Sequence, residues 1–134
     1  MNSFEIAERT EEILRQEPDL KLAFLFGSVV TGKMRPDSDV DIACLFPQPL
    51  TADRKMKLSE TLALELGRTI DLVDLYNVSG PILKSVLHNG RVLIKNSSTE
   101  LAHLMQRMIY NQADFMPYVR RMLLERQTRF LYGS

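Results

Sequence analysis

The feature that most constrains this sequence is a short polar segment that joins two apolar runs. The first run, residues 22–26, leads directly into a Gly27-Ser28 step, and ten residues later Asp39 and Asp41 open the second run. Because side chains alternate along a strand, the two aspartates are expected to project from one face, about 6–7 Å apart along the chain. Two carboxylates this close repel each other unless a cation lies between them. The segment therefore predicts a cation site at the start of the second strand.

The same segment also favours the binding of an anion. If Gly27-Ser28 opens a helix, the step offers free backbone N–H groups to a phosphate. Mg²⁺ suits the carboxylate end, since it binds one or two carboxylates together with substrate phosphates and water. A phosphate site beside a metal site indicates a site for a nucleoside triphosphate.

The spacing Gly27-Ser28, ten residues, Asp39-x-Asp41 resembles the signature of the nucleotidyltransferase superfamily, which includes DNA polymerase β and the aminoglycoside nucleotidyltransferases. Within it, the chain is similar to the minimal nucleotidyltransferase (MNT) proteins, roughly over residues 20–95. The resemblance implies a nucleotidyltransferase fold and an enzyme that uses ATP as co-substrate.

The match to the family pattern is incomplete in the phosphate-binding part. Many relatives read Gly-Ser-Arg-Ala-Arg-Gly-x-x-Arg-Pro-x-Ser-Asp-x-Asp. This chain follows the pattern at Gly32, Arg35, Pro36 and Ser38. It has Val29 and Thr31 where arginines are common. The pattern therefore leaves undecided which residues contact the phosphates, or that role shifts to Lys33 and Arg35.

Relatives of the polymerase type use a third acidic residue on a neighbouring strand, and this chain offers Asp71 and Asp74. On a regular strand the two face opposite ways. The family places its third carboxylate at the start of this strand, which favours Asp71, whereas Asp74 could instead leave the sheet edge or cap a turn.

The resemblance implies that Asp39, Asp41 and Asp71 are the catalytic residues and bind two Mg²⁺ ions, with Mn²⁺ as an alternative ion. Asp71 is best placed to assist loss of the proton from the attacking hydroxyl, since a base must lie within hydrogen-bond reach. The rest of the rate comes from positioning and charge stabilisation.

The sequence says less about the acceptor of the transferred nucleotide than about the active site. Free-standing MNT proteins are similar to antitoxins that transfer AMP from ATP to a tyrosine of a partner HEPN ribonuclease toxin, which implies a hetero-oligomer with such a protein. The toxin signature is an arginine followed, after four to six residues, by a histidine; neither His88 nor His103 has an arginine at that spacing. Two alternatives stay open: a non-catalytic nucleotide-binding antitoxin that acts by occlusion, and an aminoglycoside-like transferase of small molecules.

Length and composition narrow the class of protein. A chain of 134 residues predicts one domain over residues 1–134, with a core at about 20–95 and a helical segment at about 98–132. Seventeen basic and seventeen acidic residues cancel, which argues against general nucleic-acid binding. The lone Cys44 rules out an internal disulfide and a cysteine-rich zinc site. No apolar run is long enough for a membrane span, so we expect a soluble, cytoplasmic protein.

Periodicity and capping residues predict helices that alternate with strands, and hence an α/β domain with a small mixed sheet flanked by helices. Helices are expected over 2–16, briefly from Gly27 to before Arg35, over 51–66, from a Ser79 cap to 89, and over 98–130, where Pro117 should kink or split the helix near Asp114. Strands are expected over 20–26, 39–46, 69–76 and 91–95.

Overall fold

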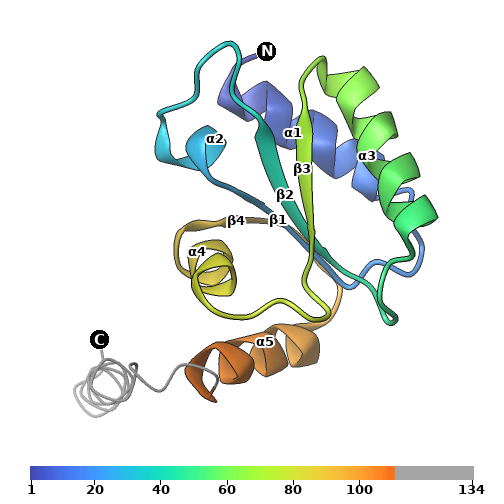
Figure 1. Cartoon of the computed structure of the whole chain (residues 1–134), viewed down its shortest axis with the longest axis vertical. Helices are drawn as coiled ribbons and strands as arrows, with labels where there is room; N and C mark the ends of the chain where they lie inside the picture. Colours follow the sequence, from blue (N-terminus) through green and yellow to red (C-terminus); the bar gives the residue numbers. More distant parts are fainter. Residues whose placement is uncertain (111–134) are drawn as a thin grey trace.

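The structure is a computed structural model, and it describes residues 1–110. Its centre is a four-stranded sheet in the order β3-β2-β1-β4 (Figure 1). In chain order the elements are α1 (Ser3–Leu14), β1 (Leu22–Phe26), α2 (Ser28–Thr31), β2 (Val40–Leu45), α3 (Ala52–Leu66), β3 (Ile70–Asp74), α4 (Pro81–Asn89), β4 (Arg91–Lys95) and α5 (Ser98–Tyr110). The predicted α/β class is confirmed.

The sheet is mixed, as the sequence predicted. β1 runs antiparallel to both of its neighbours, β2 and β4. β2 and β3 are parallel, because α3 forms the crossover that returns the chain to the same edge. The end of β1 therefore lies beside the beginnings of β2 and β3.

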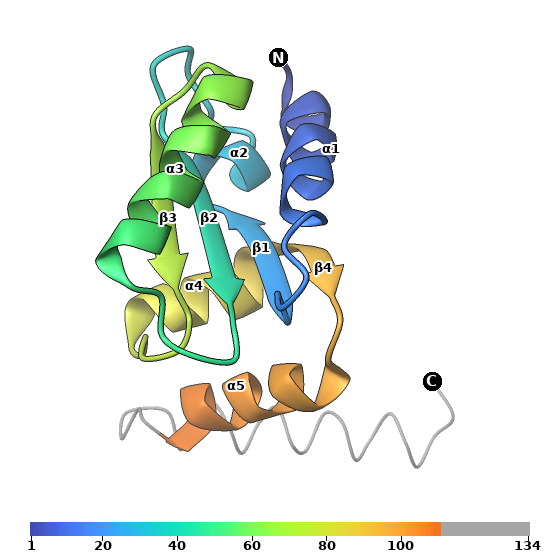
Figure 2. The same ribbon diagram turned by 90° about the vertical axis from the view of Figure 1, so that its right-hand side faces the viewer.

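Helices cover both faces of the sheet, and each face has its own hydrophobic core. Figure 2 shows α3 in front of the sheet, α1 beside it at the upper right, α4 behind it and α5 across its lower end. Val40, Ile42 and Cys44 of β2 belong to the core under α1 and α3, and Cys44 is fully buried. Ala43 and Leu45, which share the face of Asp41, belong to the core under α4 and α5. Beyond Asp41, both faces of β2 are therefore apolar and buried.

Two helix starts follow the capping rules, and a third does not. Asn2 accepts a hydrogen bond from the Glu5 amide at 2.8 Å, and Thr51 accepts one from the Arg54 amide at 3.1 Å. The predicted Ser79 cap of α4 is wrong: the N-cap is Gly80, at φ 73° and ψ −148°. A backbone in this region is essentially restricted to glycine.

Two apolar side chains of α3 and α4 are exposed. Ile82 in the first turn of α4 is 48% exposed, because the sheet-facing stripe of this short helix is Leu83 and Val86. Met56 in α3 is 55% exposed, because the buried stripe of that helix begins only at Leu58.

The C-terminal helix is confirmed as far as Tyr110. The predicted break at Pro117 and the remaining length of that helix lie outside the described residues, so the single-domain boundaries stay a prediction. Over residues 1–110, no helix combines the length and the apolar character needed to cross a membrane.

Candidate active site

The candidate site lies where the end of β1 meets the starts of β2 and β3. Phe26, the last residue of β1, pairs with Asp41 of β2. On the other side of β2, Asp41 pairs with Asp71 of β3. Gly27 follows Phe26 directly, so the sheet register alone brings the glycine bend and two of the predicted carboxylates to one edge.

Gly27 packs directly against the carboxylate of Asp41. A β-carbon built on Gly27 would lie 2.1 Å from Asp41 Oδ2, far inside contact distance. The backbone of Gly27 also has φ 74° and ψ −150°, a region that side-chain-bearing residues avoid. Two independent constraints therefore require glycine here, and the bend faces the aspartate.

Asp41 and Asp71 are neighbouring carboxyl groups on paired strands. Partial burial, followed by the charge of Asp71, a hydrogen bond with Asp71 and the charge of Asp39, raises the pKa of Asp41 to about 6. Asp71 itself is exposed. The pair therefore concentrates negative charge at the rim of the sheet, where a cation would relieve the repulsion.

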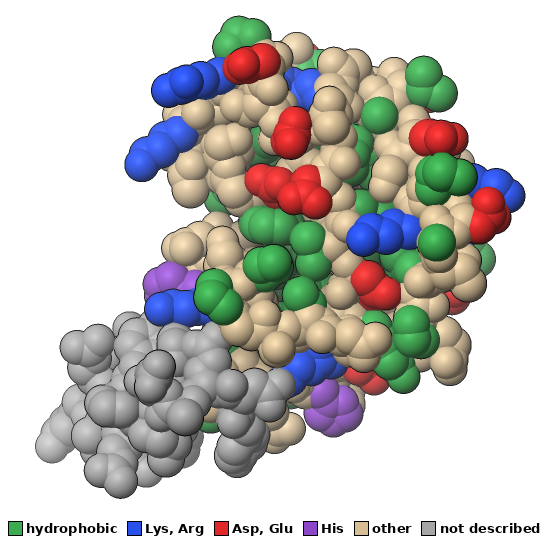
Figure 3. Space-filling view, in the orientation of Figure 1, with side chains coloured by type: hydrophobic (Ala, Val, Ile, Leu, Met, Phe, Trp, Pro, Cys, Tyr) green, Lys and Arg blue, Asp and Glu red, His purple; other side chains and the backbone are tan. Residues whose placement is uncertain are grey.

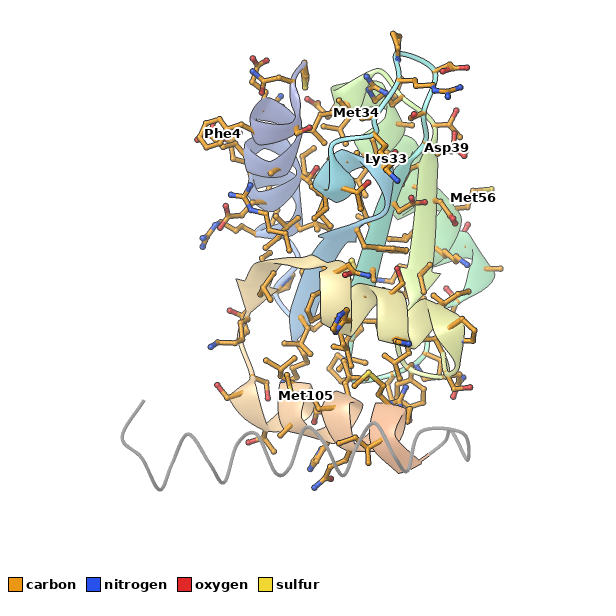
Figure 4. All side chains as sticks on the ribbon, turned by 90° about the vertical axis from the view of Figure 1, so that its left-hand side faces the viewer. Phe4, Lys33, Met34, Asp39, Met56 and Met105 are labelled. Carbon is orange, nitrogen blue, oxygen red and sulfur yellow. The ribbon has the colours of Figure 1, made fainter. Side chains whose placement is uncertain are left out.

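Asp39 is exposed and lies at the end of a tight turn over residues 35–38. In that turn the Ser38 amide donates to the Arg35 carbonyl at 3.0 Å, and the Arg35 amide donates to Ser38 Oγ at 2.8 Å. Figure 4 shows Asp39, Lys33 and Met34 at the same end of the sheet. Asp39 thus reaches the site from a turn, and not from within β2.

The two candidates for the third carboxylate have different surroundings. Asp74 accepts hydrogen bonds from the Leu50 amide at 2.9 Å and the Tyr76 amide at 3.0 Å, so it joins two loops at the far end of β3. Asp71 lies beside Asp41. Asp71 therefore lies at the candidate site and Asp74 caps a turn at the other end of β3, while the catalytic role of Asp71 stays a prediction.

The predicted phosphate contacts lie around α2. Ser28 is the first residue of this one-turn helix, and in the described part of the chain no side chain caps the helix start at Gly27. Lys33 and Arg35 are exposed on the segment that follows. Figure 3 shows acidic side chains gathered on this face, above a hydrophobic patch and beside a notch in the surface.

The donor set fits a divalent cation that is shared with a substrate. Carboxylate oxygens with neighbouring like charges are the ligands that Mg²⁺ takes, completed by phosphate oxygens and water. Among residues 1–110, no three acidic, histidine or cysteine side chains converge closely enough to hold an ion by themselves. The pair Asp41 and Asp71, with the exposed Asp39, therefore suits an ion that arrives with a nucleotide.

One residue of this region, Arg68, makes contacts that no sequence motif predicts. Arg68, between α3 and β3, donates through Nη1 to the carbonyls of Arg35 and Ser38. It lies thirty or more positions from its partners and outside every motif, so pattern reading missed it.

Comparison with known proteins shows which family the chain resembles. The chain is 37% identical over 76 residues to a protein adenylyltransferase MntA of Shewanella oneidensis, a match that covers 57% of this chain and 55% of the relative. The chain thus spans about half the length of that relative. It is 28% identical over 120 residues to the MntA of Aphanizomenon flos-aquae, with coverage of 82% and 80%.

A solved structure described as a toxin–antitoxin with AMP-PNP superposes with a TM-score of 0.67 at 26% identity, and covers 92% of this chain and 94% of that one. The model of the family described as "Polymerase beta, Nucleotidyltransferase" matches residues 8–99. This stretch holds β1 to β4, the glycine bend and all three candidate carboxylates. The chain belongs to the polymerase β nucleotidyltransferase family.

Proposed function

We propose that this protein is an antitoxin with protein adenylyltransferase activity, which transfers AMP from ATP to a tyrosine hydroxyl of a HEPN ribonuclease toxin. The observation that carries the proposal is the contact of Gly27 with Asp41, with Asp71 paired on the next strand. A bend that can approach a triphosphate lies against carboxylates that can share a cation with it.

In this proposal Asp39, Asp41 and Asp71 hold Mg²⁺, with Mn²⁺ as a substitute. When bound, the ions supply charge neutralisation for the attacking and leaving oxygens. The backbone at Gly27 and Ser28 binds the triphosphate, and Lys33 or Arg35 contributes positive charge to it. These groups orient the α-phosphorus toward the acceptor.

Asp71 is the residue that takes the proton of the acceptor hydroxyl. It is exposed and therefore open to an incoming protein side chain, whereas Asp41 is half-buried. The hydroxyl oxygen forms a bond to the α-phosphorus, the bond from the α-phosphorus to the oxygen bridging to the β-phosphorus breaks, and pyrophosphate leaves. The proton passes to the Asp71 carboxylate and then to water.

The choice of acceptor and partner is supported by the relatives. Two of them are named protein adenylyltransferase MntA, and a related fold was solved as a toxin–antitoxin with AMP-PNP. We propose a hetero-oligomer with a HEPN toxin in the cytoplasm, where ATP and Mg²⁺ are available. The balanced charge of the sequence supports a protein acceptor over general nucleic-acid binding.

The test is incubation of the chain with Mg²⁺, α-labelled ATP and a HEPN protein encoded by a neighbouring gene. We expect labelled AMP on a toxin tyrosine, identified by mass spectrometry, together with loss of ribonuclease activity. The Asp39→Asn/Asp41→Asn double variant should fold and transfer nothing. Neutralisation without added AMP would instead favour an antitoxin that acts by occlusion. Pyrophosphate release with an aminoglycoside and no partner would favour a small-molecule transferase.

A further inference from the structure

We propose that Arg68 is a positioning residue, which holds Asp39 in the place where it can bind a divalent cation. Arg68 Nη1 donates to the Arg35 carbonyl at 2.9 Å and to the Ser38 carbonyl at 3.0 Å. These two carbonyls are the ends of the turn that leads into Asp39. One guanidinium therefore holds both ends of that turn.

The residue after Arg68 fixes the other side of Asp39. The Thr69 carbonyl accepts a hydrogen bond from the Val40 amide at 2.9 Å. Ser38 and Val40 flank Asp39, so its backbone is held on both sides by two consecutive residues of another segment. The position of Asp39 thus depends on residues 68 and 69 as well as on its own turn.

Arg68 is itself rigidly anchored. It follows Gly67, which ends α3 at φ 64° and donates its amide to the Ala63 carbonyl at 2.8 Å. Two residues after Arg68, Ile70 begins β3 and pairs with Val40. The backbone of Arg68 is thus held between a capped helix end and a paired strand, so its side chain can position the surface turn.

In the described part of the chain, the bonds that position Asp39 are to the backbone on either side of it and not to its side chain. Within residues 1–110, its carboxylate takes part in no hydrogen bond or ion pair, and the residue is exposed. Over the same residues, the bonds of Arg68 go to backbone carbonyls and to no carboxylate. Arg68 therefore acts on the geometry of the turn, and does not neutralise the charge that a cation would meet.

This inference rests on the proposed function, because it assumes that Asp39 binds a metal ion that acts with ATP. Loss of residues that orient metal ligands typically costs 10- to 100-fold in metal affinity or activity. We expect the effect of Arg68 to be seen in metal affinity, since the guanidinium touches only the segment that presents a ligand.

The experiment measures Mn²⁺ binding by electron paramagnetic resonance in the presence of AMP-PNP, for the full chain and its variants. For Arg68→Met we expect the Mn²⁺ dissociation constant to rise about tenfold. Arg68→Lys, whose ammonium can still reach one carbonyl, should fall between Met and wild type. The control is Arg15→Met, which removes an exposed arginine whose ion pair within residues 1–110 is with Glu11, and which should bind Mn²⁺ as wild type does.

A second comparison separates positioning from general structural damage. In an Asp39→Asn background, Arg68→Met should change the Mn²⁺ dissociation constant less than about twofold, because the ligand it positions is already gone. A folded Arg68→Met protein with wild-type affinity would overturn the inference. So would an equal loss with and without Asp39.

The two proposals fail in different ways. If the wild type binds Mn²⁺ with AMP-PNP but transfers no AMP to the HEPN protein, the proposed activity is wrong, and the binding measurement still decides the role of Arg68. If the wild type binds no Mn²⁺ with AMP-PNP, both proposals are overturned. If the wild type binds and transfers while Arg68→Met binds equally well, only the role of Arg68 is wrong.

Discussion

Gly27 lies so close to Asp41 that no side chain fits between them: a β-carbon on Gly27 would be 2.1 Å from Asp41 Oδ2. The contact joins the proposed phosphate end of the site to its carboxylate end. Because Gly27 directly follows Phe26, which pairs with Asp41, neither residue can move away without disturbing the sheet.

The first prediction is that Gly27→Ala loses both stability and AMP transfer. Gly80 is a matched control, because it has nearly the same backbone angles (φ 73°, ψ −148°), while a β-carbon added to it would meet no atom of the described residues within 4 Å. Gly80→Ala should cost about 1–3 kcal/mol of unfolding free energy from backbone strain. Gly27→Ala should cost about 1–3 kcal/mol more from overlap with Asp41. Urea denaturation of both variants measures the difference; equal losses would show that the close contact carries no energy.

The second prediction concerns the pH dependence of the metal-free protein. The folded-state pKa of Asp41 is raised to about 6, above its usual value of 3.8. Between these values the folded state binds more protons than the unfolded state, so stability falls as the pH rises from about 4 through 6. Asp41→Asn should remove this fall and stabilise the protein at pH 7.5, on the order of 1 kcal/mol after allowance for solvent screening. Unfolding in EDTA at pH 5 and pH 7.5 tests this, and an unchanged pH difference in Asp41→Asn would contradict it.

How much of the site was predictable depended on whether the determining contacts were local. The helices predicted from residues 2 and 51 begin at caps, Asn2 and Thr51, whose bonds join residues only three positions apart. The Ser79 cap was wrong because side-chain chemistry favours serine, whereas the path of the chain into α4 needs a positive φ. The partners of Arg68 are set by the packing of α3 and β3 against the turn, and no spacing along the chain reports that.

The third prediction tests the end of the sheet away from the site. Arg54 bonds Asp19 and Glu17 and lies 4.3 Å above the centroid of the Phe46 ring. Arg54→Ala should cost about 1–2 kcal/mol, since each partly exposed contact contributes about 0.2–1 kcal/mol. AMP transfer should be nearly unchanged, because these residues lie at the opposite end of β2 from Asp41.

The loss of stability in Arg54→Ala should also depend on pH. The hydrogen bond from Arg54 lowers the pKa of Asp19. The stabilisation is therefore present above the unfolded-state pKa near 3.8 and is lost as the pH falls through the lower folded-state value. Thermal unfolding at pH 7 and pH 3 should show the difference between wild type and Arg54→Ala narrowing at pH 3. A difference that is equal at both values would contradict the assigned ion pairs.

The fourth prediction separates the two acidic residues of β3. Asp71→Asn should reduce AMP transfer by at least about 100-fold while the unfolding free energy of the metal-free protein stays equal or rises, because a repulsive charge beside Asp41 is removed. Asp74→Ala should instead lower the unfolding free energy and leave AMP transfer nearly unchanged. It leaves the Leu50 and Tyr76 amides without their acceptor, which costs about 1–3 kcal/mol, and it leaves transfer within a few-fold of wild type. Single-turnover transfer and urea unfolding of both variants decide the assignment.

The opposite result would move the catalytic carboxylate to the other end of β3. If Asp74→Ala abolished transfer in a folded protein while Asp71→Asn retained it, the proton acceptor would have to be sought among the loops that Asp74 joins.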